Sequence, residues 1–340
     1  MAIVSSTYAP NEWQFAMKAE TTTGTASVTT MQKINVDPDS IVSMSQDVTQ
    51  VLEPRSTPGR TVKFADAFVT DKGGHKTSVS VSGVFDTTIA ALLLSNALGV
   101  AVTTGPASYN MAYNYAPTAR AHGATTGTII NSFTFALVPP IASKTIVLVG
   151  CVCSSLEVTF DKATEGGRGH FSATFETAYI PLSGQSTPAS MAAYGSTFRY
   201  LREFNAVKSI NVAAGGAVDL VLNKVGYTIN NNVVYSGNQG TNGDPELIQR
   251  AIPAADIGLV IGVKYDTNTE MLWDTRRSGS NVSVIVTNHS TPATVSFGIT
   301  AAFCQIDAEV SPSGTDAGVF QDLSLKCLAS TTGDIIAITP

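Results

Sequence analysis

This chain of 340 residues has little charge. Asp, Glu, Lys and Arg make up 14% of its residues, against about 25% in a typical soluble domain. Thr, Ser, Asn and Gly take their place, so the surface is expected to be polar but weakly charged. Such a surface suits a protein that buries much of its outside in an assembly. It equally suits an ordinary all-β domain with a Thr- and Ser-rich exterior.

Basic clusters are also lacking. The formal net charge is −6, and the longest basic run is the pair Arg276 and Arg277. Proteins that bind nucleic acid specifically hold the phosphates with clustered Lys and Arg, so the sequence disfavours that class of function. An acidic protein can still face DNA if its task is to avoid sticking to it.

No apolar run approaches the roughly 20 residues that cross a bilayer, and polar residues follow Met1 to Ile3 where a secretory signal would continue apolar. We therefore expect a chain made in a cytoplasm, with no membrane anchor. The four cysteines are then expected to be reduced and buried. Cys151 and Cys153 share one face of a strand but lack the second ligand pair that a zinc site needs.

Catalytic signatures are missing as well. The sequence has no Walker-type loop, HExxH, GxSxG or CxxC motif. The glycines at 166, 167 and 169 lack the lysine and the following helix of a phosphate loop, and none of the four histidines has a partner at a fixed spacing. The sequence therefore predicts no enzyme, no catalytic residue, no metal site and no cofactor.

Alternating strands dominate what is present. Residues 146–180 read as two strands, each alternating between an apolar and a polar series, joined by a polar glycine-rich tip. Residues 297–328 resemble this hairpin about 150 positions later, with Cys304 aligned on Cys153 and Phe320 on Phe171. A repeat of this kind decides the architecture, so we expect a duplicated fold.

Two helices are expected, one in each half. Residues 86–99 begin with the N-cap candidate Asp86, carry a leucine-rich face and end at Gly99. Residues 244–258 offer Asp244 as N-cap and Pro245 at the first helical position, with Pro253 ending or kinking the helix. A hairpin turn is expected at residues 71–74.

The expected fold class is mainly β (α+β): two β-sandwich domains, each with a short flanking helix. Residues 1–32 are interpreted as an extended N-terminal arm, residues 33–185 as the first domain and residues 186–340 as the second. The boundary lies in a linker rich in small and turn residues at 182–198.

Two long segments are predicted to form contacts, residues 47–60 and 100–131. Loops of this length are usually functional or form interfaces, and tyrosines suit protein contacts. The residues predicted to make these contacts are Glu53, Arg55, Tyr109, Tyr113 and Tyr115.

Four stretches together resemble the tail tube proteins (major tail proteins) of tailed bacteriophages. They are VSVSGVFDTTIAALLLSNALG (79–99), SFTFALVP (132–139) with VGCVCSSLEVTF (149–160), GHFSATFETAYI (169–180) and GTDAGVFQDLSLKCLAS (314–330). The resemblance covers most of residues 35–340, although its motifs are loose strand patterns.

The resemblance implies a structural virion protein whose subunits join their inner strands into a β-barrel and stack as rings into a tube that conducts DNA. Implied partners are further copies of the chain in the same ring and in adjacent rings, and the resemblance assigns the five contact residues named above to the contact between rings. Further implied partners are the tape measure, tail terminator and baseplate proteins, and passing DNA. With duplicated domains the ring would hold three chains; with one tube domain and one decoration it would hold six. The alternatives are a head–tail connector or baseplate ring protein, and a saccharide-binding tail-fibre protein.

Overall fold

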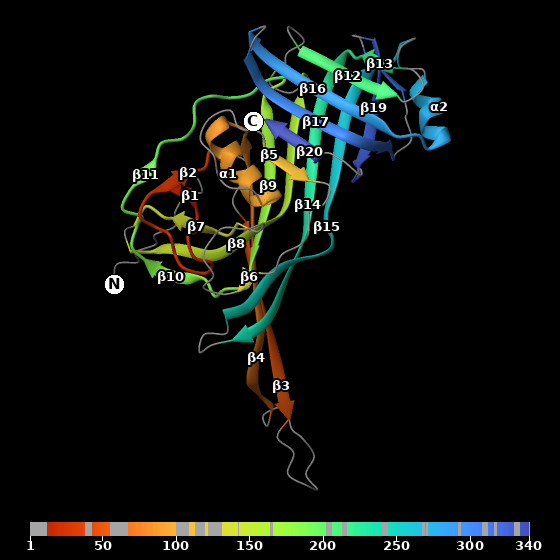
Figure 1. Ribbon diagram of the computed structural model, residues 1–340. Coiled ribbons are helices and arrows are strands. Elements are labelled where there is room, and N and C mark those ends of the chain that lie inside the picture. Colours follow the sequence, from red (N-terminus) through yellow and green to blue (C-terminus); the bar gives the residue numbers. More distant parts are fainter. Residues whose placement is uncertain are drawn as a thin grey trace.

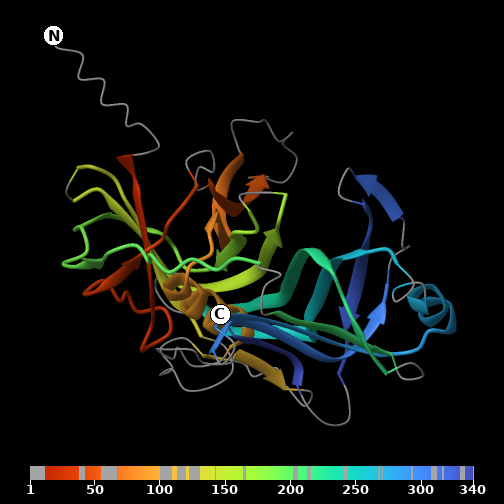
Figure 2. The same cartoon turned by 90° about the horizontal axis from the view of Figure 1, so that it is seen from above.

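The computed structural model describes residues 12–37, 43–54, 67–99, 109–112, 120–121, 131–141, 143–163, 166–201, 206–212, 216–239, 244–266, 269, 271–291, 294–307, 312–315, 318–329 and 334–339. Within them the chain is mainly β, as the sequence predicts, and contains two helices. The two halves of the chain lie side by side (Figures 1 and 2).

The first half holds the following elements: β1 (Gln14–Ala19), β2 (Met31–Lys33), β3 (Ser43–Pro54), β4 (Ala67–Val84), α1 (Thr87–Leu98), β5 (Tyr109–Ala112), β6 (Arg120–Ala121), β7 (Phe133–Val138), β8 (Thr145–Asp161), β9 (Gly169–Thr177), β10 (Leu182–Gln185) and β11 (Met191–Ala192). The second half holds β12 (Ala206–Val212), β13 (Gly216–Asp219), β14 (Leu222–Gln239), β15 (Asp244–Lys264), α2 (Met271–Ser278), β16 (Val282–Thr291), β17 (Thr294–Ile306), β18 (Pro312–Thr315), β19 (Gly318–Cys327) and β20 (Asp334–Thr339).

One antiparallel sheet runs through both halves. Its strands follow the order β3, β4, β9, β8, β14, β15 and β19, and β17 and β18 lie one after the other along the far side of β19. The ladder between β8 and β14 joins the halves, because β8 belongs to the first and β14 to the second. A strand edge of each half is thereby removed from solvent.

The second half repeats the pairings of the first. The pairs β1–β2, β1–β7, β3–β4, β4–β9, β7–β8, β8–β9 and β8–β10 recur in the same order as β12–β13, β12–β16, β14–β15, β15–β19, β16–β17, β17–β19 and β17–β20. Each half also places its helix after the second strand of its long hairpin. The ladders superpose Gln321 rather than Phe320 on Phe171, one residue away from the alignment expected from the sequence.

The helix α1 agrees with its prediction. The Asp86 carboxylate accepts hydrogen bonds from the backbone N–H groups of Thr88 and Ile89 at 2.8 and 3.0 Å, which satisfies two donors at the helix start. Gly99 ends the helix in the left-handed conformation at φ 75°. The buried side of α1 includes Leu93 and Leu94, and the helix packs against β8.

The helix expected at residues 244–258 is wrong: these residues form most of β15. They are the partner of β14 in a long hairpin, and this tertiary pairing outweighs the local helix-start signals of Asp244 and Pro245. Pro253 falls where the register jumps from Asn231↔Ala255 to Val233↔Arg250, and an irregularity of this kind tolerates a residue without an N–H group.

The helix of the second half is α2, which the sequence reading missed because it is short and polar. Leu272 and Thr275 are buried, while the exposed side chains Asp274 and Arg277 lie 3.5 Å apart. Asp274 in the first turn and the two arginines in the last turn have the signs that favour the helix dipole.

Three further expectations need correction. Residues 71–74 are not a turn but continue β4, which pairs with β3 across them with small register shifts. Residues 12–32, expected to belong to an extended arm, include β1 and part of β2, with Met17 and Met31 buried. The segment 100–131, expected to be a loop, contains the strands β5 and β6.

The hydrophobic core continues from one half into the other. The rings of Phe160 on β8 and Phe297 on β17 stack with centroids 4.5 Å apart, and Phe85 meets Phe160 edge-on at 6.0 Å. The four cysteines are free and buried, as predicted. A second buried cluster gathers Val147, Val152 and Tyr179 with Ile248 on the distal part of β15.

Candidate assembly edges of the sheet

The junction of the two halves shows how this sheet is extended. Between β8 and β14 the ladder runs from Lys224↔Asp161 to Asn230↔Ser155. Tyr227 of β14 lies opposite Val158 of β8, and both side chains are almost fully buried, at 1% and 0% exposed. The junction is therefore a packed, core-forming contact between two strands far apart in the sequence.

Two hydrogen bonds of a buried asparagine join the halves beside α1. The Asn231 amide donates hydrogen bonds to the carbonyl oxygens of Ala97, at the end of α1, and Cys153, on β8, at 2.7 and 3.0 Å. Asn231 is 5% exposed. Its amide therefore satisfies two carbonyl groups of the first half from a strand of the second.

Each of the two strands that form this junction has a counterpart in the other half, and both counterparts lie at the ends of the sheet. The strand β3 corresponds to β14, and its one ladder among the described residues is with β4. The pairs Met44↔Val79 and Tyr227↔Leu259 occupy equivalent positions. Met44 is 39% exposed, whereas its counterpart Tyr227 is buried by β8. Met44 is thus an apolar side chain at a sheet edge that lacks, among the described residues, the neighbouring strand that its counterpart has.

At the other end, β17 and β18 together correspond to β8. Gln305 and Ile306 of β17 and all four residues of β18 pair with β19, and β19 pairs with β15 on its opposite side. The residues Pro312 and Gly314 of β18 are exposed, and a Cβ atom added to Gly314 would meet no atom within 4 Å. In the described chain this end of the sheet is accessible.

The sheet has one apolar and one polar face. The apolar face carries the core side chains, including Val158, Phe175 and Leu259. The polar face carries Ser and Thr side chains and a few charges of both signs. Val260 and Phe320 also lie on it. The polar residues described on it are Ser45, Lys76, Ser78, Ser80, Ser82, Ser155, Glu157, Thr159, Asp161, Ser172, Thr174, Glu176, Lys224, Thr228, Asn230, Asp256, Lys264, Asp322, Ser324 and Lys326.

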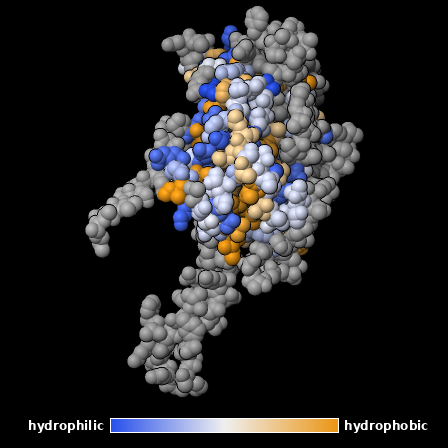
Figure 3. Space-filling view, turned by 90° about the vertical axis from the view of Figure 1, so that its left-hand side faces the viewer, coloured by the Kyte–Doolittle hydropathy of each residue, from blue (hydrophilic) through white to orange (hydrophobic). Residues whose placement is uncertain are grey.

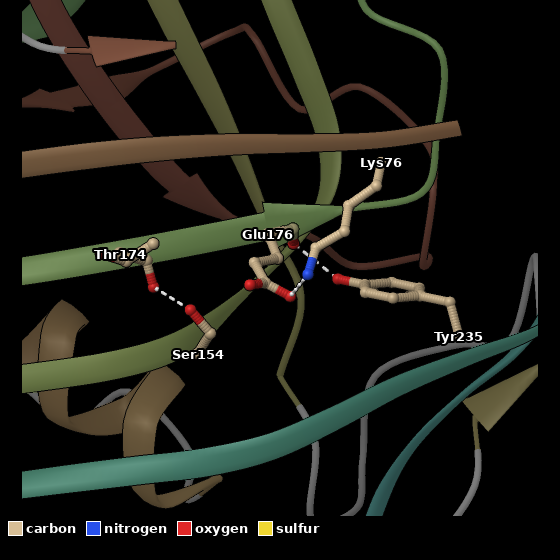
Figure 4. A network of polar contacts seen from close by, with 5 residues as sticks. All are labelled: Lys76, Ser154, Thr174, Glu176 and Tyr235. Carbon is tan, nitrogen blue, oxygen red and sulfur yellow. Dashed lines mark hydrogen bonds and ion pairs between the residues drawn. The ribbon is translucent and has the colours of Figure 1, made fainter. Parts of the chain in front are cut away.

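Two ion pairs join charges of the polar face across strands. Lys76 and Glu176 lie 3.1 Å apart on β4 and β9 (Figure 4), and Lys326 and Asp256 lie 3.5 Å apart on β19 and β15. These pairs are partly exposed and contribute little to stability. Lys224 of β14 also lies opposite Asp161 of β8 in the ladder, so acidic and basic residues alternate on this face.

A network at the end of this face holds the long hairpin of the second half against the first half. The Tyr235 hydroxyl donates a hydrogen bond to the Glu176 carbonyl oxygen at 2.5 Å, and the Ser154 hydroxyl donates one to the Thr174 carbonyl oxygen at 3.1 Å (Figure 4). Burial is the main cause that raises the pKa of Tyr235 above its ordinary value. Tyr235 thus remains a neutral donor that ties β14 to β9.

The contact residues predicted from the sequence are only partly described. Tyr109 is 1% exposed on β5, where it pairs with Ile338 of β20, so its side chain belongs to the core. Glu53 pairs with Phe68 in the β3–β4 hairpin, which extends away from the rest of the chain in Figure 1. Arg55, Tyr113 and Tyr115 lie outside the described residues.

Sequence reasoning missed Met44 and the β18 edge. The repeat of the long hairpins, which relates Met44 to Tyr227, became visible only through the ladders. The outer face shown in Figure 3 is mostly polar with small apolar patches. Among the described residues there is no cluster of three potential metal ligands, and no helix is long and apolar enough to span a membrane.

Comparison with known proteins adds no further assignment: no known family model matches the chain, and no curated protein is similar to it in sequence.

Proposed function

We propose that this chain is a structural protein of a phage tail tube, and that it closes into rings through the two ends of its sheet. The observation that carries the proposal is the buried β8–β14 junction. The counterpart of β14, which is β3, and the counterpart of β8, which is β17 with β18, are both accessible edges of the sheet. Pairing β3 of one copy with β17 and β18 of the next would repeat between chains the contact that each chain already makes within itself.

Ring closure would also cover the exposed strand edges. An exposed strand edge with an apolar side chain such as Met44 is a template for uncontrolled pairing. A heterologous contact between two different edges forms a closed ring when the rotation closes, and a filament when it does not. Each chain contributes eight strand positions to the sheet, so three chains would form a barrel of about 24 strands, wide enough for an open channel.

The polar face suits the lumen of such a barrel. Since α1 packs on the core side of β8, closing the sheet with the core outward turns the serine- and threonine-rich face toward the channel. A surface of hydroxyl groups in which acidic side chains stand among the lysines offers DNA few sites where a lysine would hold a phosphate. This composition supports a channel through which DNA passes without specific binding.

Three chains per ring are favoured over six because the halves repeat each other. In a trimer each half would occupy one of six similar positions. In a hexamer the second half would have to be a decoration, although its strands continue the same sheet as those of the first.

Electron microscopy of the purified protein tests the proposal against its alternative. A tube protein is expected to form long hollow tubes with regular cross-striations, which implies stacking of rings in addition to their closure. A head–tail connector or baseplate ring would give discrete rings that never stack. Monomers that neither close nor stack, even when preformed rings are added as seeds, would contradict both readings.

A further inference from the structure

Three apolar side chains are exposed together at one end of the second half. Val221, Tyr265 and Val319 are 41%, 36% and 42% exposed. Backbone hydrogen bonds hold them side by side: Lys264 N–H donates to Val221 O at 2.9 Å, and Tyr265 N–H donates to Val319 O at 2.8 Å. We call these three residues the open end of the second half.

The same position in the first half is covered by the chain itself. Residues 197–201 cross it, with Gly169 N–H donating to Arg199 O at 2.8 Å and Leu201 N–H donating to Gly167 O at 2.7 Å. The Arg168 guanidinium lies 4.1 Å from the centroid of the Phe198 ring. Leu201 is 2% exposed, so the segment packs closely against the hairpin of β8 and β9.

Two observations identify these positions as equivalent. The hydrogen bond from Phe85 N–H to Gly169 O, at 2.8 Å, has its counterpart in the bond from Tyr265 to Val319. The sequence Phe-Asp-Thr at 85–87 recurs as Tyr-Asp-Thr at 265–267. In each case the aspartate accepts a backbone hydrogen bond from a residue three positions later, Ile89 or Thr269.

The two positions differ in what lies over them. A Cβ atom added to Gly167 would meet Leu201 O at 2.8 Å, and one added to Gly318, which corresponds to Arg168, would meet among the described residues only the Phe320 ring, at 4.0 Å. Because Tyr265 and Val319 correspond to Phe85 and Gly169, the open end is the position that residues 197–201 cover in the first half, and its apolar side chains are exposed.

The covering segment has a counterpart in the sequence. Residues 196–204 read STFRYLREF and lead into β12, the first strand of the second half. Residues 6–13 read STYAPNEW and lead into β1, the first strand of the first half. Both share Ser-Thr-aromatic, then three or four residues, then Glu-aromatic. The segment before β1 thus carries the pattern of the segment that covers the first half.

We propose that residues 6–10 of a second copy of this chain bind across the open end, as residues 196–200 bind across the first half. Tyr8 takes the position of Phe198, and the Ala9 carbonyl accepts a hydrogen bond from Val319 N–H, as the Arg199 carbonyl does from Gly169. The partner is a second copy because β1 and α2 lie on opposite sides of the molecule in Figures 1 and 2. This inference rests on the proposed ring, in which a second copy's first half follows the open end.

Disulfide trapping between full-length chains tests the arrangement. One variant carries Ala9→Cys and the other Val319→Cys; they are mixed in equal amounts, assembled and oxidised with glutathione disulfide. The native cysteines are buried and serve as an internal background. The expected product is a disulfide-linked pair of two different chains, absent when either variant is oxidised alone. Adding Tyr8→Ala to the first variant should lower its yield at least about tenfold, since buried aromatic residues often dominate an interface.

A matched control replaces Val319→Cys by Ser172→Cys, an exposed position on the polar face of the first half, which should give no linked pair. The mass of the assembled rings is measured on the same samples. Rings without a disulfide between the cysteines at positions 9 and 319 would overturn the proposal that residues 6–10 bind across the open end. The proposed function would then still stand. Failure to form any ring would overturn the proposed function and, with it, the second copy as partner.

Discussion

At the scale of single residues, Glu20 is the buried charge that organises the start of the chain. Its carboxylate is 2% exposed and accepts hydrogen bonds from Gly24 N–H, Gly150 N–H and the hydroxyls of Ser132 and Thr134, at 2.7 to 3.0 Å. These donors come from the segment after β1, from β7 and its approach, and from β8. Glu20 therefore fastens the beginning of the first half to two strands of its sheet.

Burial raises the pKa of Glu20 above its ordinary value, and the four hydrogen bonds offset part of that effect. The folded state therefore binds a proton at a higher pH than the unfolded state does. The contribution of this group to stability is complete below the unfolded pKa and is lost as pH rises through the folded pKa. Glu20→Gln should remove this part of the pH dependence, measured as the free energy of unfolding in urea between pH 4 and 7. Glu157→Gln, an exposed carboxylate, is the control; the same slope in Glu20→Gln as in the unchanged protein would contradict the assignment.

Asn231 is the corresponding residue at the junction of the halves. Asn231→Ala removes the two buried hydrogen bonds to the carbonyl oxygens of Ala97 and Cys153, which should lower the free energy of unfolding by about 1–3 kcal/mol. The adjacent exposed change Asn230→Ala should cost less than about 0.5 kcal/mol. Equal losses from both variants, in denaturant unfolding, would show that the amide does not hold the junction.

At the scale of elements, the sequence predicts most strands and one helix correctly. The region 146–180 contains the predicted hairpin because its apolar residues alternate at 156–160 and 171–175, where β8 and β9 pair. The helix α1 forms because its cap, leucine face and terminal glycine agree. Residues 244–258 fail because a long-range partner, β14, decides their structure. Pairing between distant strands is what local signals do not encode, and the assembly edges depend on that pairing.

A substitution on the edge of β3 tests whether this strand forms the contact between chains. Met44→Glu places a charge where the counterpart Tyr227 is buried, and its desolvation should weaken each contact between chains by about 2 kcal/mol, or about thirtyfold in the dissociation constant. Sedimentation velocity over a range of concentrations measures this loss. The monomer should keep its unfolding midpoint because Met44 is already exposed.

Met44→Leu is the matched control and should assemble normally, because leucine keeps the apolar volume at this position. Normal assembly of Met44→Glu would show that the edge of β3 is not the contact.

At the scale of the whole molecule, two similar sets of strands share one sheet and one continuous core. The first half presents β3 at one end, and the second presents β17 and β18 at the other. In the proposed ring, the contact between chains repeats the internal junction of β8 and β14. The sequence predicts a duplicated fold, and the strand pairings of the first half do recur in the second. The domain boundary near 185 and the predicted ring contacts remain predictions.

The number of chains in one ring tests this account most directly. Native mass spectrometry of purified rings should give three chains of 35.4 kDa each, because two similar halves per chain fill six positions. Rings of six chains would contradict the equivalence of the halves, since the second half would then lie outside the repeating barrel.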